Sequence, residues 1–500
     1  MKEYLSINKN RIVAIIIALL PILLSYMLFP DFMGDDAFIH LGFIKGLIAT
    51  GKFSYAGNVT YGTTSPMWVI MGFVFSKIFS NPEISIRILC AIFTFLTVYI
   101  FYVTILDENI NKSIAFLALL SLVLNPFLLK WAITGMEASA AASALLIIYR
   151  LNKKELTGLS SFIIGIVFGV SILLRPEFMA FFILILVFDY FFYPAARKRL
   201  LYIAIPCFVI IFTWLYYAYS QFGTIIPNTY VAKAGGGLIK LEYQGFVRDL
   251  KVLIASNLPE FFLVGFLIIY VPLLLIINKD FKFILKKYFV LLKSNQISLI
   301  LLWAVGFYGF YILKDVTILS RYSLVLVPLI ILFAAITFNF FSGNFSIKAT
   351  RLVLSLYMLI IIIAYGYITL NVVMPSNNNF VKGFQQTYQE ISTIIRNNSE
   401  GKNVSVAASD VGIIGCYSGA GIDDLGGLVD HTRFSYKSNA EYVSSKKPDF
   451  IILRGESSIR DILPKNAGFK MLYEKKVPGF AINDPAPRLV SLYKIIYYGK

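Results

Sequence analysis

The hydrophobic pattern of the chain divides it into two parts. Runs of Ile, Leu, Val, Phe and Ala recur from residue 12 to about residue 370, separated by short polar segments. A bilayer core about 30 Å thick needs roughly 20 apolar residues per helix, a length that such runs reach repeatedly. From about Ser376 the sequence is mixed and polar, and no window is long enough to span. The pattern predicts an α-helical membrane domain over residues 1–375 and a soluble domain over residues 376–500.

Basic residues gather in polar segments between the apolar runs. Besides the N-terminal segment, the clusters are NK at 111–112, RLNKKE at 150–155, ARKRL at 196–200, the Lys-rich stretch 279–293 and SIKATR at 346–351. If the positive-inside rule places all of them in the cytoplasm, the chain crosses the membrane twice between successive clusters, which fits the apolar runs between them. The predicted topology has about eleven spans, a cytoplasmic N-terminus and an external C-terminal domain.

The first external segment, residues 30–85, contains an apolar stretch that is short for a span. SPMWVIMGFVFSKIF at residues 65–79 begins with Ser-Pro, is interrupted by Gly72 and is soon followed by a longer apolar run. This length suits an interfacial or re-entrant helix better than a full crossing, so we expect interfacial helices in this segment. The pattern leaves open whether residues 65–79 cross. The N-terminal run has no small-residue cleavage site after it and is predicted to be a retained first span.

Composition supports a membrane protein and removes one apparent alternative. The chain has 500 residues, of which 58% are hydrophobic, 16% aromatic and 15% charged, and its mean hydropathy is +0.74. Soluble domains do not combine these values, so we predict a multi-pass protein of the plasma (inner) membrane. The net charge of +17 would suit binding to nucleic acid. The basic cytoplasmic loops of a polytopic protein account for this charge, so no nucleic-acid partner is predicted. The three cysteines predict neither a disulfide framework nor a Cys-based metal site.

The unusual polar residues fall on the same side of the predicted membrane domain. They lie at outer helix ends or in external loops and are Asp35, Asp36, Glu137, Arg175, Glu177, Asn228, Lys233 and Arg321. Ionisable groups at membrane depth cost several kcal/mol unless they are paired or face a wet cavity. The topology was derived from the basic loops alone, so this agreement is partly independent. The sequence therefore predicts one external cavity.

Two adjacent carboxylates in GDDAFIH are the candidates for catalysis. Asp35 or Asp36 can act as general base on an acceptor hydroxyl, while its neighbour orients the acceptor or binds a divalent cation. Alternatively, Asp35 caps a helix and Asp36 lies in its first turn, where carboxylates favour the helix dipole. His40 lies one turn beyond Asp36 on the same face, either as a ligand or as a polar-face residue. Both interpretations remain open.

Three basic side chains are candidates for binding a phosphate. Arg175 and Arg321 lie at outer helix ends, where the phosphate of a lipid carrier would be, and guanidinium binds phosphate oxygens as a bidentate fork. Snorkelling toward lipid headgroups is the alternative. Lys233 in the external loop is the third candidate, and AGGG at residues 234–237 gives that loop the freedom of an active-site lid.

The ordered set of motifs resembles a known family. GDDAFIHLGFIKGLIATGKFSY, YGTTSPMW, TGMEAS, LLRPE, FGTIIPNTYVAKAGG and SRYSLVLVPL look like the polyprenyl-phosphate-sugar-dependent glycosyltransferases of the GT-C fold. The resemblance covers about the first 330 residues and is strongest to the branch that contains mycobacterial terminal arabinofuranosyltransferases. It implies Asp35 or Asp36 as catalytic base and inverting transfer of a sugar from a polyprenyl-phosphate donor. Candidate substrate-binding residues are His40, Tyr61, Glu137, Glu177, Asn228 and Tyr230.

The chain also departs from relatives of that fold. It has no second acidic motif with the spacing of oligosaccharyltransferase catalytic subunits and no convincing set of metal ligands, so metal dependence stays open and a divalent cation remains a candidate cofactor. In the tail, residues 403–430 and 442–453 resemble the soluble ends of these relatives. Their pattern alone predicts a strand, a short helix and a later strand, that is, a small α/β unit.

The sequence thus predicts an integral membrane glycosyltransferase whose active site opens to the external side. Its partners would be a polyprenyl-phosphate-linked sugar, membrane lipids and a glycan, lipid or protein acceptor. The rival prediction is a flippase or transporter of lipid-linked saccharides, which would show internal repeats and charged groups deep in the membrane. An O-antigen-type polymerase would carry a large central external loop with paired arginines. The sequence shows no internal repeat, and its acids and arginines lie at one face, which argues against the flippase; a globular C-terminal domain does not favour the polymerase.

Overall fold

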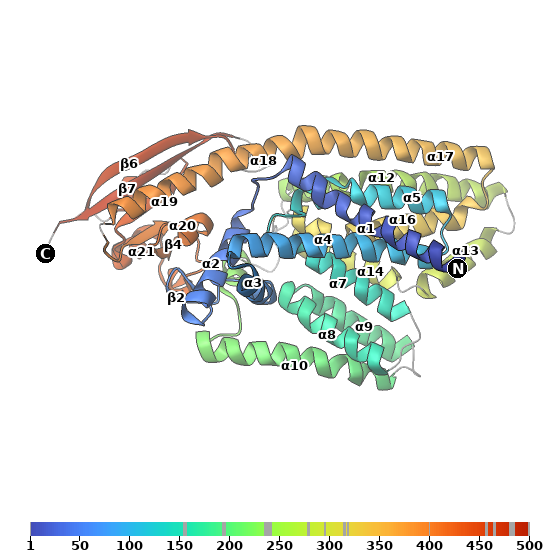
Figure 1. Ribbon diagram of the computed structural model, residues 1–500, viewed down its shortest axis with the longest axis horizontal. Coiled ribbons are helices and arrows are strands. Elements are labelled where there is room, and N and C mark those ends of the chain that lie inside the picture. Colours follow the sequence, from blue (N-terminus) through green and yellow to red (C-terminus); the bar gives the residue numbers. More distant parts are fainter. Residues whose placement is uncertain are drawn as a thin grey trace.

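The computed structural model describes most of the chain. The described residues are 2–153, 158–192, 197–234, 243–277, 281–294, 297–313, 317, 320–399, 401–455, 459–463, 467–479 and 486–498. Helices form an elongated region, and a sheet covered by short helices lies at one end of it (Figure 1). This arrangement confirms the predicted class, a helical membrane protein with a C-terminal α/β domain.

Long apolar helices make up the helical region. They are α1 (Lys2–Leu28), α4 (Pro82–Asp107), α5 (Lys112–Val123), α7 (Ala138–Lys153), α8 (Gly158–Leu174), α9 (Phe178–Phe192), α10 (Arg197–Phe222), α12 (Tyr243–Ile277), α14 (Ile297–Leu313), α16 (Val327–Ser342) and α17 (Ile347–Ile360). Four further helices lie between them: α6 (Pro126–Trp131), α11 (Asn228–Ala234), α13 (Phe281–Ser294) and α15 (Ser320–Leu324). Most of the long helices run along the long axis of the molecule (Figure 1).

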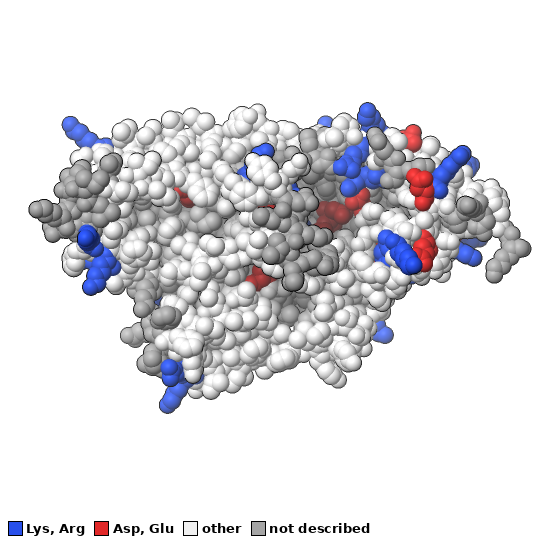
Figure 2. All heavy atoms as spheres, turned by 180° about the vertical axis from the view of Figure 1, so that it is seen from behind, with Lys and Arg blue, Asp and Glu red and all other residues white. Residues whose placement is uncertain are grey.

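The outer surface of this region is apolar, as a bilayer requires. Phe212 and Ile363 expose 60% of their area each, and Figure 2 shows few charged side chains over the middle of the helical region. Within the described residues, four helices are long and apolar enough to cross a membrane, or five if one bent pair is a single span. Six further apolar helices are shorter. The chain is a multi-pass membrane protein, and the number of about eleven spans remains a prediction.

The basic clusters gather at the end of the helical region that lies far from the sheet. Figure 1 places the N-terminus, α13 and the beginning of α17 at that end, and Figure 2 shows Lys and Arg there. The helix that starts with α17 continues through Asn398 over 52 residues and enters the C-terminal domain. The predicted boundary at residues 375–376 falls inside this helix, and the division into domains stays a prediction.

The first loop folds into helices that pack on the membrane region. It contains α2 (Asp35–Thr50), the short strands β1 (Ser54–Tyr55) and β2 (Asn58–Val59), and α3 (Pro66–Phe79). In Figure 1, α3 crosses the direction of α4. A Cβ atom on Gly72 would lie 2.5 Å from the Ile44 side chain, so the glycine that interrupts the apolar pattern allows α3 to approach α2 closely. The position of α3 in the membrane interface remains a prediction.

The C-terminal domain is a five-stranded sheet with helices. Its strands are β3 (Ser405–Ala408), β4 (Gly421–Asp424), β5 (Phe450–Arg454), β6 (Ala467–Val477) and β7 (Arg488–Tyr497), in the order β4-β3-β5-β7-β6. β3 pairs in parallel with β4 and β5, and the other pairs are antiparallel. The helices are α19 (Gln386–Asn398), α20 (Gly412–Tyr417) and α21 (Asn439–Lys446). The predicted strand, short helix and later strand are β3, α20 and β5.

The C-terminal domain docks on α2 through specific contacts. The Tyr55 hydroxyl donates to the carbonyl of Val411 at 2.7 Å, and the Cys416 thiol donates to the carbonyl of Phe38 at 2.9 Å. Lys45 donates to the Cys416 carbonyl at 3.0 Å. These bonds join elements that lie far apart in sequence. They hold the α/β domain directly over the first loop, where the candidate carboxylates lie.

A buried carboxyl group ties α12 to its neighbours within the helical region. Glu260 is 1% exposed and accepts hydrogen bonds from the hydroxyls of Ser121 at 2.5 Å, Tyr357 at 2.8 Å and Tyr365 at 3.1 Å. α12 is kinked just before this point, at Asn257. The three hydroxyl groups come from α5 and from the long helix that begins with α17, so Glu260 links α12 to both of these helices.

Glu260→Ala is expected to destabilise the fold more than Glu260→Gln. The alanine leaves three buried hydroxyl groups without their acceptor, and each unsatisfied buried group costs about 1–3 kcal/mol. Glutamine keeps one acceptor oxygen and most of the volume. The apparent melting temperature of each purified variant in detergent measures the effect. Equal melting temperatures for the two variants would contradict the cross-linking role.

Candidate functional site

A cavity of about 750 Å³ opens where α2, α9, α14 and α15 meet beneath the C-terminal domain. One part of its lining is polar and includes Asp36, His40, Glu137, Arg175, Glu177, Arg321 and Tyr322. The other part is apolar and is formed by α9 and α14, with Ala180, Leu184, Leu302, Trp303, Phe307 and Phe310. A polar pocket that continues into an apolar wall suits a ligand with a charged head and a hydrocarbon tail.

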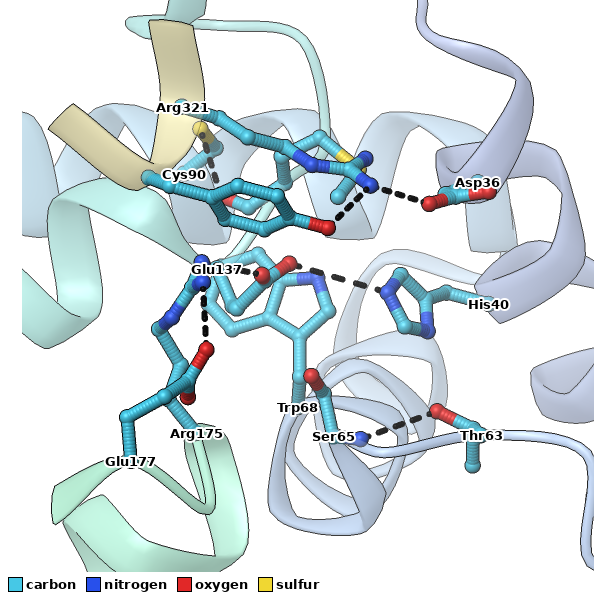
Figure 3. A network of polar contacts seen from close by, with 12 residues as sticks. Asp36, His40, Thr63, Ser65, Trp68, Cys90, Glu137, Arg175, Glu177 and Arg321 are labelled. Atoms are coloured by element: carbon cyan, nitrogen blue, oxygen red, sulfur yellow. Dashed lines mark hydrogen bonds and ion pairs between the residues drawn. The ribbon is translucent and has the colours of Figure 1, made fainter. Parts of the chain in front are cut away.

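Asp36 and Arg321 form an ion pair in the polar part of the cavity. Asp36 lies in the first turn of α2, where the partial positive charge of the helix N-terminus stabilises its carboxylate. The carboxylate accepts a hydrogen bond from Nη2 of Arg321. Figure 3 shows the two side chains pointing toward each other. The Asp36 side chain remains 29% exposed, whereas that of Arg321 is 7% exposed. The carboxylate is therefore within reach of a ligand.

A second cluster surrounds Arg175 at the end of α8. Its guanidinium donates to Glu137 and to Glu177, both at 3.1 Å, and the Tyr311 hydroxyl also donates to Glu177. The Tyr322 ring separates the two arginines: the Cζ atom of Arg175 lies 4.5 Å from its centroid, and that of Arg321 lies 5.1 Å from it. Two cations are thus held near each other without direct contact (Figure 3).

Several buried polar atoms around the cavity have no hydrogen-bond partner among the described residues. They are Nδ1 of His40, Oε2 of Glu137, Oε2 of Glu177, Oγ1 of Thr229 and Nε of Arg321. Unsatisfied buried polar groups cost free energy, and their gathering at one cavity indicates a polar ligand. His40 Nε2 lies 3.7 Å from Glu137 Oε2, which orients the imidazole toward this cluster.

Asp35 points away from the cavity, although it is the neighbour of Asp36. It lies beneath α20, where a Cβ atom on Gly412 would come within 2.3 Å of its Oδ1 atom. Burial, followed by the charges of Asp410 and Asp36, raises the pKa of Asp35 well above its usual value. Successive helical residues are rotated by about 100°, which separates the two carboxyl groups. Asp35 is thus enclosed by the C-terminal domain, and Asp36 faces the cavity.

The remaining predicted residues occupy different surroundings. The Tyr61 hydroxyl accepts a hydrogen bond from Trp214 at 2.7 Å. The Asn228 amide donates to Thr60 at 3.0 Å, and the Asn228 backbone N–H donates to the carbonyl of Tyr61 at 2.8 Å. These contacts fix α10 and α11 against the first loop, and neither Tyr61 nor Asn228 is among the described residues that line the cavity.

Of the predicted residues on α11, only one has a described side chain in the cavity. Tyr230 lines the cavity, whereas the side chain of Lys233 and most of the AGGG segment lie outside the described residues. Within the described part of the chain, no group of three or more His, Cys, Asp or Glu residues is arranged to hold a metal ion. The roles of Lys233 and of a divalent cation stay predictions.

Sequence reasoning missed several residues that line the cavity. Trp303, Tyr311 and Tyr322 lie in apolar runs, where an aromatic residue gives no separate signal. Tyr322 directly follows Arg321 and could have been noticed on that ground. Leu428 belongs to the C-terminal domain, about a hundred residues after the last predicted site residue, and nothing in its local sequence points to the cavity.

Comparison with solved structures identifies the fold. ArnT from Cupriavidus metallidurans bound to undecaprenyl phosphate superposes with a TM-score of 0.60 at 12% identity, covering 95% of this chain and 97% of that chain. The apo state of the same protein gives 0.59 at 11% identity and covers 98% of both chains. An Archaeoglobus fulgidus oligosaccharyltransferase in complex with zinc and sulfate gives 0.53 at 16% identity, covering 88% of this chain and 67% of that chain. The chain has the GT-C fold.

Sequence comparisons add one match. A family model described as "Domain of unknown function (DUF8728)" matches residues 378–493, which correspond to most of the C-terminal domain. A search of curated proteins found no match. The resemblance to the mycobacterial branch rests on the motifs alone and stays a prediction.

Proposed function

We propose that this protein is an integral membrane glycosyltransferase that transfers a sugar from a polyprenyl-phosphate donor to an external acceptor hydroxyl with inversion. The observation that carries the proposal is the single cavity that joins the Asp36–Arg321 pair to an apolar wall on α9 and α14. A lipid phosphate sugar has a matching layout, with a phosphate between a sugar and a hydrocarbon chain. The GT-C fold and a structural neighbour bound to undecaprenyl phosphate support the same class.

The lipid chain of the donor would lie along α9 and α14. Leu302 and Phe310 line the cavity and are 58% and 50% exposed. An exposed apolar wall of this kind suits a donor chain that enters sideways from the bilayer. The phosphate would then reach Arg321, with Arg175 on the far side of the Tyr322 ring contributing positive potential.

Asp36 would serve as the catalytic base. It takes the proton of the acceptor hydroxyl while the hydroxyl oxygen forms a bond to the anomeric carbon. The bond between that carbon and the phosphate oxygen breaks, and polyprenyl phosphate leaves with the bonding electrons. Arg321 stabilises the charge that develops on the phosphate. Arg321 pairs with Asp36, and a bound phosphate would compete for the guanidinium and free the carboxylate.

The topology of the sequence prediction belongs to the same proposal. Residues 1–375 would form the catalytic membrane domain, with the basic end of the helical region in the cytoplasm and the site on the external side of the inner membrane. Residues 376–500 would form an external domain. No nucleotide is required, which suits a compartment without nucleotide sugars.

Incubation of the protein in nanodiscs with a panel of radiolabelled polyprenyl-phosphate sugars tests the proposal. Release of free polyprenyl phosphate from one donor, dependent on the protein, is the expected result. If no donor is consumed and lipid-linked saccharide crosses liposomes in a protein-dependent way, the transferase proposal is wrong and the flippase alternative holds.

A further inference from the structure

We propose that the C-terminal domain supplies one wall of an acceptor subsite, and that this subsite takes an uncharged sugar. The wall consists of Leu428 from the loop at residues 424–430, together with Thr63 and Thr64 of the first loop and Thr229 and Tyr230 of α11. We call this set the acceptor wall. The inference rests on the proposed transferase function and adds the class of acceptor and the residues that recognise it.

Leu428 brings the C-terminal domain into the cavity itself. It lines the same cavity as Asp36 and Arg321. The loop at residues 424–430 approaches the first loop so closely that a Cβ atom on Gly62 would lie 2.8 Å from the Leu428 carbonyl oxygen and 2.9 Å from the Val429 side chain. The backbone of the loop at residues 424–430 thus packs directly against the backbone of the first loop, and the loop forms part of the cavity wall.

The conformation of this loop is held by side chains at both of its ends. The fully buried Asp424 carboxyl accepts hydrogen bonds from the backbone N–H groups of Gly426 at 2.8 Å and Val429 at 2.7 Å. Gly427 adopts a positive φ of 71°, which glycine permits without strain. At the other end, Asp430 accepts from the Tyr442 hydroxyl at 2.7 Å. Leu428 is therefore presented by a loop whose conformation is fixed by hydrogen bonds to its own domain.

The chemistry of the acceptor wall suits the hydroxyl groups of a sugar. The Thr229 hydroxyl is buried, at 7% residue exposure, and has no hydrogen-bond partner among the described residues. Tyr230 is 53% exposed and offers an aromatic ring beside it. None of the five described residues that make up the acceptor wall is charged. Hydroxyl and apolar groups of this kind favour a neutral ligand over a charged one.

The position of the wall leaves the acceptor as its natural occupant. The donor's chain is assigned to α9 and α14 and its phosphate to Arg321, so the acceptor must approach Asp36 from the remaining side. The external domain covers that side and contributes Leu428. The domain at residues 376–500 would in this way contact the acceptor directly and contribute to its recognition.

The experiment uses the full chain in nanodiscs with the donor that the wild type cleaves. Acceptor probes are octyl glycosides of neutral hexoses, beside glycosides that carry a carboxylate. We expect Thr229→Val and Leu428→Trp each to raise KM for the best neutral glycoside about three- to tenfold, as the loss of one neutral hydrogen bond or an altered contact would do. Cleavage of the donor by water in the absence of glycoside should stay within about twofold of wild type.

Matched controls and a milder variant separate this effect from misfolding. Thr393→Val on α19 and Leu489→Trp on β7 make the same kinds of change at exposed residues of the C-terminal domain. Both should leave KM for the glycoside unchanged. Leu428→Ala keeps the loop testable if the tryptophan variant does not fold. An unchanged KM for the glycoside in Thr229→Val and Leu428→Ala would overturn the subsite, as would equal losses of transfer and of donor cleavage or a preference for the charged glycoside. If the wild type cleaves no donor, the proposed function fails instead.

Discussion

Asp36→Asn is expected to lower the rate of sugar transfer by about 10²–10⁴-fold, the usual contribution of a general base. The amide keeps the volume of Asp36 in the cavity but cannot accept the proton of the acceptor hydroxyl. Release of polyprenyl phosphate at saturating donor and acceptor measures the rate. The melting temperature and the elution volume of the variant show whether it is folded.

Asp35→Asn is the matched control for this experiment. Asp35 lies next to Asp36 in sequence but is enclosed beneath Gly412, and its raised pKa makes a neutral amide a close substitute. We expect its transfer rate to remain within about threefold of wild type, since the residue does not reach the reacting groups. The assignment of the base to Asp36 would fail if Asp35→Asn lost transfer while Asp36→Asn, correctly folded, retained it.

Arg321→Gln is expected to lower the rate of sugar transfer by about 10²–10³-fold, the usual effect of removing a hydrogen-bond donor that stabilises charge in the transition state. The departing phosphate would lose its bidentate partner, so KM for the donor should rise and kcat should fall. Arg321→Lys restores the charge without the planar fork and should recover part of the rate. Arg396→Gln, on the exposed face of α19, is a control that should leave both parameters unchanged.

The pair can also be tested as a unit. Because Arg321 and Asp36 contact each other, their effects should not add: the double variant Asp36→Asn, Arg321→Gln should be about as slow as the slower single variant. Full additivity of the two losses would show that the residues act independently. It would contradict the idea that a bound phosphate releases Asp36 from Arg321.

Much of the fold could be predicted because its signal is local. Apolar runs as long as a bilayer is thick must become helices, since no other open structure satisfies the backbone inside lipid. The alternation in the tail likewise predicted β3, α20 and β5 from neighbouring residues. The β6–β7 hairpin was not predicted, because pairing of Ala467–Val477 with Arg488–Tyr497 depends on partners outside each strand.

The sequence by itself determined that polar residues at the helix ends would gather on one side, because a membrane allows few places for charge. It also placed Asp35 and Asp36 together at the start of a helix. Only the tertiary structure gives the two carboxyl groups different surroundings. The turn of α2 directs one carboxyl toward the cavity and the other beneath α20, and Arg321 reaches Asp36 from 285 residues away. Leu428 enters the cavity because the C-terminal domain docks on α2, and packing between distant segments leaves no mark in a local pattern of residues.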